Sequence, residues 1–124
     1  MKGLESVVLP LEQSRALAEA GIVLDTALVW VYVKDANGRI VLTVMSRRDA
    51  AAACLGADCD GQKIICGAPV LSELMNAIYA RYDNAEITMY GSGLIDVWIG
   101  KEAYQQNEDT DLLAAYALLL EVAK

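Results

Sequence analysis

The stretch that decides the fold runs from Leu28 to Met45 and reads L-V-W-V-Y-V-K-D-A-N-G-R-I-V-L-T-V-M. It consists of two runs of β-branched and aromatic residues, and such residues favour strands. Between the runs lies Asp35-Ala36-Asn37-Gly38, in which Asn-Gly is the strongest short signal for a hairpin turn. We therefore predict a hairpin with strands over residues 28–34 and 39–45.

Side-chain alternation predicts which residues of this hairpin share a face. We expect a loop of two or four residues, and either length places the same side chains together. One face is then aliphatic and is expected to meet the core: Val29, Val31, Val33, Ile40, Leu42 and Val44. The other face mixes aromatic, aliphatic and polar side chains: Trp30, Tyr32, Lys34, Val41, Thr43 and Met45.

A second hairpin is predicted from residues 86–90 and 94–99, which flank Gly91-Ser92-Gly93. With a three-residue loop, its alternation again separates an aliphatic face from a mixed one. The aliphatic residues are Ile87, Met89, Ile95, Val97 and Ile99. The mixed face carries Glu86, Thr88, Tyr90, Leu94, Asp96 and Trp98.

Three further segments show helical periodicity and helix end signals. The first follows Pro10 and ends before Gly21, and the last is capped by Asp109 or Thr110. The middle helix opens with Ala68-Pro69, and its expected core stripe is Leu71, Leu74, Met75, Ile78 and Tyr82. The expected core stripe of the last helix is Leu112, Leu113, Tyr116, Leu119, Leu120 and Ala123.

The outer face of the last helix is expected to be apolar as well. It would consist of Ala114, Ala115, Ala117 and Leu118. Such a face is either a seam between copies of the chain or a run of alanines that simply favour a helix.

The segment between the first hairpin and the middle helix is the least regular. Residues 47–55 are expected to form a short helix, capped by Ser46 and ended by Gly56, and a polar loop is expected to follow. The predicted order is α-ββ-α-ββ-α in a single domain over residues 1–124. The simplest fold of this order is α+β, with a four-stranded, mainly antiparallel sheet and its helices on one face.

That fold leaves an open surface where the two mixed faces adjoin. It would carry Trp30, Tyr32, Tyr90, Asp96 and Trp98, a mixture of aromatic and polar side chains that is typical of interaction surfaces. We predict that these five residues bind a protein partner or a second copy of the chain. The alternative is that the first helix, residues 46–63 or a second subunit covers them.

Charge and hydropathy exclude other partners. The net charge of −7 repels phosphate backbones and anionic lipid headgroups, so we expect no nucleic acid and no membrane as partner. The longest apolar runs, residues 27–33 and 112–120, fall short of the ~20 residues that cross a bilayer. No signal peptide is apparent, and we expect a cytoplasmic protein.

The three cysteines lie between Cys54 and Cys66, with Asp58 and Asp60 around Cys59. Their spacing does not match zinc sites, the chain has no histidine, and D-C-D-G does not continue as a calcium loop. Catalytic triads that use histidine are likewise excluded. We expect no metal, no cofactor and no catalytic residue, with Cys66 acting as a small buried apolar side chain.

Three segments carry a resemblance: L-P-L-E-Q-S-R-A-L-A-E-A-G-I, A-P-V-L-S-E-L-M-N-A-I-Y-A-R-Y and D-L-L-A-A-Y-A-L-L-L-E-V. In this order they resemble a group of short uncharacterised bacterial and prophage proteins, which have an L-P-x-E-Q-type first helix and a helix that opens with A-P. The resemblance implies an accessory or mobile-element setting and transfers no site residue. Residues 50–66 depart from it.

These observations favour a small non-enzymatic interaction protein that associates with itself through the aromatic sheet face or the terminal helix. An acidic inhibitor that imitates nucleic acid is the alternative, and it needs carboxylates aligned on one surface. An enzyme that uses Cys59, or the carboxylates of Glu86 and Asp96, is a third hypothesis.

Overall fold

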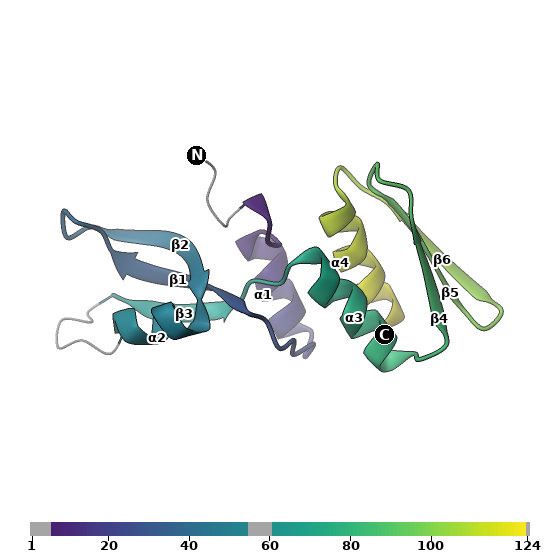
Figure 1. Ribbon diagram of the computed structural model, residues 1–124, viewed down its shortest axis with the longest axis horizontal. Coiled ribbons are helices and arrows are strands. Elements are labelled where there is room, and N and C mark those ends of the chain that lie inside the picture. The colour runs from purple at the N-terminus through teal and green to yellow at the C-terminus, as the bar shows by residue number, and fades with distance from the viewer. Residues whose placement is uncertain (1–5, 55–60, 124) are drawn as a thin grey trace.

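The computed structural model describes residues 6–54 and 61–123. In chain order its elements are α1 (Leu11–Glu19), β1 (Leu28–Lys34), β2 (Ile40–Ser46), α2 (Arg47–Cys54), β3 (Lys63–Gly67), α3 (Leu71–Arg81), β4 (Ala85–Met89), β5 (Leu94–Ile99), β6 (Glu102–Asn107) and α4 (Asp111–Val122). Figure 1 shows an elongated molecule with a sheet at each end and α1, α3 and α4 between them. The predicted α+β class is confirmed.

The single four-stranded sheet predicted from the sequence is wrong. The strands form two separate antiparallel sheets, a first sheet of order β2-β1-β3 and a second sheet of order β4-β5-β6. Each predicted hairpin gains its own third strand, because β3 pairs with β1 and β6 pairs with β5. The hairpins therefore do not pair with each other.

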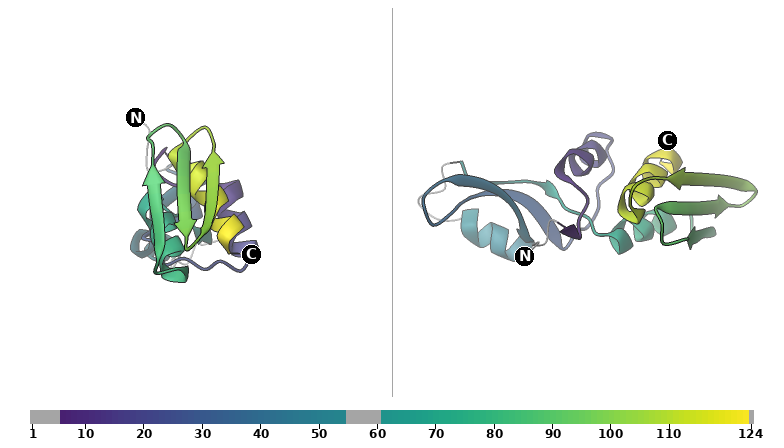
Figure 2. Two further views of the ribbon diagram at one scale, coloured as in Figure 1. Left: turned by 90° about the vertical axis from the view of Figure 1, so that its right-hand side faces the viewer. Right: turned by 90° about the horizontal axis from the view of Figure 1, so that it is seen from above.

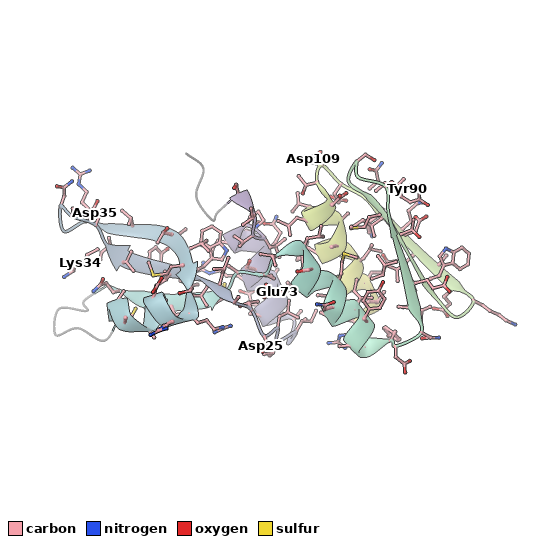
Figure 3. All side chains as sticks on the ribbon, viewed as in Figure 1. Asp25, Lys34, Asp35, Glu73, Tyr90 and Asp109 are labelled. Carbon is pink, nitrogen blue, oxygen red and sulfur yellow. The ribbon has the colours of Figure 1, made fainter. Side chains whose placement is uncertain are left out.

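The loop of the first hairpin has three residues, and this length reverses the predicted faces of β2. The Asp35 N–H donates to the Arg39 carbonyl at 2.8 Å, and the Gly38 N–H donates to the Asp35 carbonyl at 3.1 Å. The Asp35 carboxylate, at the tip of the first sheet in Figure 3, accepts from the backbone N–H groups of Asn37 and Arg39. Gly38 takes φ +78°, which closes this kind of turn.

An odd loop shifts the pairing by one residue, so each side chain of β2 lies on the face opposite to the one predicted. Trp30 pairs with Val44, and Val29 pairs with Met45. Ile40, Leu42 and Val44 therefore share the side of Trp30 and Tyr32. The side of Val29, Val31 and Val33 instead receives Val41, Thr43 and Met45.

Both faces of the first sheet are covered near its centre. Ala50 of α2 packs against Val29 and Val31, and the predicted cap holds because the Asp49 N–H donates to Ser46 Oγ at 3.0 Å. The predicted end of this helix, Gly56, lies outside the described residues. On the other face, Trp30 is buried in a cluster with Val8, Val44 and Ala68.

The main core lies between the second sheet and the helices. α3 and α4 cover one face of this sheet, and the left view of Figure 2 looks onto its other face. Leu74 and Ile78 of α3 are fully buried, in agreement with the predicted stripe. Leu9, Leu17 and Ile22 extend the same core toward α1.

The predicted outer face of the last helix is wrong. Ala114, Ala115 and Leu118 are at most 1% exposed and lie in the core, and no residue of the range 111–123 is exposed. Because α4 lies among the second sheet, α3 and the α1 segment, its residues are buried or partly buried and none is fully exposed. Burial raises the pKa of Tyr116, and the nearby carboxylate of Glu12 on α1 raises it further.

The loop of the second hairpin packs against the backbone at Glu108, and this contact can be tested. Gly91 and Gly93 both have positive φ, but only a Cβ on Gly93 would overlap the carbonyl oxygen of Glu108. We expect Gly91→Ala to cost about 1–2 kcal/mol of unfolding free energy, from backbone strain alone. Gly93→Ala should cost about 1–3 kcal/mol more, from the overlap. Urea denaturation measures both, and equal losses would contradict this packing.

Candidate interaction surface

The face of the second sheet that points away from α3 and α4 is not covered by any described element (Figures 1 and 2). We call it the open face, and its residues are Glu86, Thr88, Tyr90, Leu94, Asp96, Trp98, Ala103, Gln105 and Asn107. Trp98 is 49% exposed and Tyr90 is 54% exposed. The three-residue loop predicted for the second hairpin is confirmed, because Met89 pairs with Ile95 and the Tyr90 N–H donates to the Leu94 carbonyl.

The strand register arranges the open face in rows. In one row Trp98 lies between Glu86 of β4 and Ala103 of β6. Ala103 is too small to cover an indole, so the β6 side of the Trp98 ring has no large neighbour in this row. The indole is therefore flanked in this row by a carboxylate on one side and by a methyl group on the other.

Asp96 is the polar centre of the next row. Its Oδ2 accepts from the Tyr90 hydroxyl at 2.8 Å, and its Oδ1 accepts from Gln105 Nε2 at 2.7 Å. Both carboxylate oxygens thus have a donor, and the two flanking side chains are held in place. The hydrogen bond to Asp96, followed by the charge of that carboxylate, raises the pKa of Tyr90 above its ordinary value.

The open face carries negative charge only. Glu86 and Asp96 lie on it, and it includes no lysine or arginine. Lys101 lies beyond its end, in the turn between β5 and β6. A cationic group that approaches this face therefore meets carboxylates and the faces of aromatic rings, which both attract cations.

The structure separates the residues that the sequence analysis placed on one surface. Tyr90, Asp96 and Trp98 lie together on the open face, whereas Trp30 and Tyr32 belong to the first sheet. Trp30 is 7% exposed, and its Nε1–H donates to the Leu9 carbonyl at 3.0 Å. The prediction that both tryptophans share an open surface is therefore wrong. Val8 and Leu9, which precede α1, cover Trp30 together with Leu11 of α1. Of the covers that the alternative prediction named, only the first helix contributes, through Leu11.

Sequence reasoning missed three residues of the open face, Ala103, Gln105 and Asn107, because it predicted no strand after Ile99. The sequence signal for β6 was present but weak. Gly100-Lys101 is a two-residue turn, and the polar run that follows places Tyr104 and Gln106 on the helix side of the sheet. A polar edge strand lacks the apolar alternation on which strand prediction depends.

The cysteines do not form a common site in the described residues. Cys54 packs beside Val29 and Val31, and Cys66 packs in the Trp30 cluster on the opposite side of the first sheet. Burial raises the pKa of the Cys66 thiol. Cys59 lies outside the described residues. Within residues 6–54 and 61–123, no three cysteine or carboxylate side chains are grouped so that they could hold a metal ion.

A hollow of about 460 Å³ lies between residues 22–25 and α3. Its lining includes Glu73, whose carboxylate accepts from the backbone N–H groups of Ala27 and Val70, both at 2.9 Å. Figure 3 labels Glu73 at the centre of the molecule, close to Asp25. Both carboxylate oxygens of Glu73 therefore bind the backbone of the chain between the two sheets. Because Glu73 is used in this way by the fold, the open face is a stronger candidate for function than the hollow.

The two tryptophans should differ in their access to solvent. Trp98→Phe leaves only the buried Trp30, so we expect most of the fluorescence that acrylamide quenches to be lost. Trp30→Phe leaves the half-exposed Trp98 and should preserve that fluorescence. Stern–Volmer plots of the two folded variants measure the difference. Equal quenching would contradict the burial of Trp30.

The hydrogen bond between Tyr90 and Asp96 predicts a specific pH dependence. The Tyr90 phenol is protonated at neutral pH, so the bond is present there. It is lost only as the pH rises through the pKa of Tyr90, which the bond itself raises. Asp96→Asn removes the charge and should lower the pKa of Tyr90. Glu86→Gln is the matched control and should leave it nearly unchanged. NMR titration of the Tyr90 ring follows both, and identical midpoints in the two variants would rule out the role of Asp96.

Comparison with family models, with curated proteins and with solved structures gave no significant match. The resemblance to short bacterial and prophage proteins therefore stays a prediction. Among the residues that the structure describes, no helix combines the length and the apolar character needed to cross a membrane.

Proposed function

We propose that the chain is a small non-enzymatic interaction protein that binds another protein through the open face. The observation that carries this proposal is the uncovered face of the second sheet, on which a half-exposed Trp98 lies beside a fixed Asp96. Tryptophan and tyrosine are enriched at protein interfaces and among the residues that dominate binding energy.

The exposed aromatic area is large enough to matter for affinity. A tryptophan buries 150–250 Å² when it is fully covered, so the half of Trp98 that is exposed offers on the order of 100 Å². Covering that area contributes about 2–3 kcal/mol at 25 cal/mol per Å². Asp96 adds directionality, because its two hydrogen bonds hold Tyr90 and Gln105 in fixed positions before a partner arrives.

Charge selects the kind of partner. A protein surface with arginine or lysine complements Glu86 and Asp96, and a guanidinium group also stacks well on an indole such as that of Trp98. A second copy of the open face is a poorer partner, because it would bring Glu86 and Asp96 close to the same carboxylates of the other copy. We therefore propose a basic protein surface as the ligand of this face.

The alternative function, an acidic inhibitor that imitates nucleic acid, has less support. Three described carboxylates serve the fold through backbone hydrogen bonds: Asp35 in the first hairpin loop, Glu73 at the start of α3, and Asp111, which accepts from the Gly93 N–H at 2.8 Å. A mimic needs its carboxylates free and aligned. The open face contributes only Glu86 and Asp96 to such an array.

A displayed library of random peptides tests the proposed ligand class. Peptides selected on the intact chain should be enriched in arginine and lysine. Trp98→Ala should weaken their binding by more than about tenfold, as expected for a residue at the centre of an interface. Fluorescence anisotropy of labelled peptides measures the dissociation constants.

One further variant serves as a control for this selection, and a second tests the contribution of charge. Tyr79→Ala removes an aromatic ring that is 39% exposed on α3, away from the open face, and should leave binding unchanged. Glu86→Gln should weaken binding and reduce its dependence on salt. The proposal fails if the selected peptides lack cationic residues or bind the Trp98→Ala and wild-type chains equally well.

A further inference from the structure

The outer edge of β2 is an unpaired strand edge in the first sheet. β2 is the outermost strand in the order β2-β1-β3, and Figure 1 shows no described element beside its free edge. Its neighbour on the other side is β1, with which it pairs over its whole length, from Ile40 to Ser46. Such an edge presents a row of backbone groups to which another strand can bond.

The hydrogen-bond pattern identifies which backbone groups point outward. Asp35 bonds to Arg39, and the Arg47 N–H donates to the Ala27 carbonyl at 3.3 Å, so the residues of β2 with odd numbers bond to β1. Because an antiparallel ladder alternates, the N–H and carbonyl groups of Ile40, Leu42 and Val44 point away from β1. No backbone hydrogen bond from elsewhere in the described chain reaches these three residues.

The side chains of this edge also lack the usual protection against pairing. Residues 40–45 read I-V-L-T-V-M and include no charge, proline or glycine. Ile40, Val41 and Leu42 are exposed by 43%, 37% and 38%, although all three are aliphatic. Protein edges are normally blocked by lysine, proline, a bulge or a covering element. An uncharged aliphatic edge without such a block is suited to pairing with another uncharged aliphatic strand.

Charge favours a second copy of the chain as that strand. The net charge of −7 makes contact between copies unfavourable wherever carboxylates would meet. β2 carries no acidic residue, so two copies can approach each other along it without opposing carboxylates. The strand also complements itself. Antiparallel pairing about Leu42 places Ile40 of each copy opposite Val44 of the other and Leu42 opposite Leu42, so that aliphatic side chains meet in all of these pairs.

We propose that β2 pairs with β2 of a second copy, antiparallel and about a two-fold axis at Leu42, to form a continuous six-stranded sheet. The outward N–H and carbonyl groups of Ile40, Leu42 and Val44 in both copies then bond across the axis. This surface lies in the first sheet, so dimer formation is independent of binding at the open face.

Analytical ultracentrifugation of the full chain, over about a hundredfold range of concentration, measures the dimer. Leu42→Lys places two ammonium groups opposite each other at the axis and should raise the dissociation constant by more than about tenfold. The matched control is Ile64→Lys, because Ile64 is 42% exposed on β3 at the other edge of the same sheet. That variant, and Trp98→Ala, should dimerise like the wild type.

Amide hydrogen exchange tests the pairing itself. At concentrations where the dimer forms, the amides of Ile40, Leu42 and Val44 should be protected, and on dilution they should exchange quickly while the amides of Val41 and Thr43 stay protected. A chain that remains monomeric over this range would overturn the proposal. So would a dimer that Ile64→Lys or Trp98→Ala dissociates, or one in which these three amides exchange freely.

Discussion

The hydrogen bond from the Trp30 indole to the Leu9 carbonyl joins the first sheet to the segment that enters the core of the second sheet. The same carbonyl accepts from Ser14 Oγ at 3.0 Å, and the Leu9 N–H donates to the Pro69 carbonyl at 2.8 Å. The Leu9 side chain is buried in the core of the second sheet, whereas Trp30 is buried beside the first sheet. A buried polar group left without a partner costs about 1–3 kcal/mol, so each of these bonds constrains how the halves meet.

These contacts around Leu9, which we call the joint, explain why the open face and the edge of β2 are available. α1, α3 and α4 lie in the middle of the elongated molecule, where they complete the joint and the main core (Figures 1 and 2). α3 and α4 pack on the inner face of the second sheet, and no described helix covers its outer face. α2 packs on a face of the first sheet and leaves the edge of β2 bare. The open face and the β2 edge are thus remote surfaces with different chemistry, one acidic and aromatic, the other uncharged and aliphatic.

The candidate site was predictable where local chemistry determined geometry. The loop Gly91-Ser92-Gly93 limits the second hairpin to three residues, so alternation alone placed Tyr90, Asp96 and Trp98 on one face. The first hairpin contains Asn-Gly, which suggests an even loop. There the Asp35 carboxylate binds two backbone N–H groups and stabilises a three-residue loop instead. A difference of one residue exchanged the faces of β2, and it also changed which residues of β2 turn their backbone groups to the edge of the proposed dimer.

The sequence by itself determined the strands of both hairpins, the helix positions and the acidic aromatic character of the open face, because these follow from periodicity, turn residues and charge between near neighbours. Only the tertiary structure decided that the hairpins lie in separate sheets, that β3 and β6 extend them, and that Trp30 is buried while Trp98 is exposed. The reason is that both indoles have similar local sequence surroundings. Burial depends on whether a distant segment packs on the strand, as Val8 and Leu9 do on Trp30 and as nothing in the described chain does on Trp98.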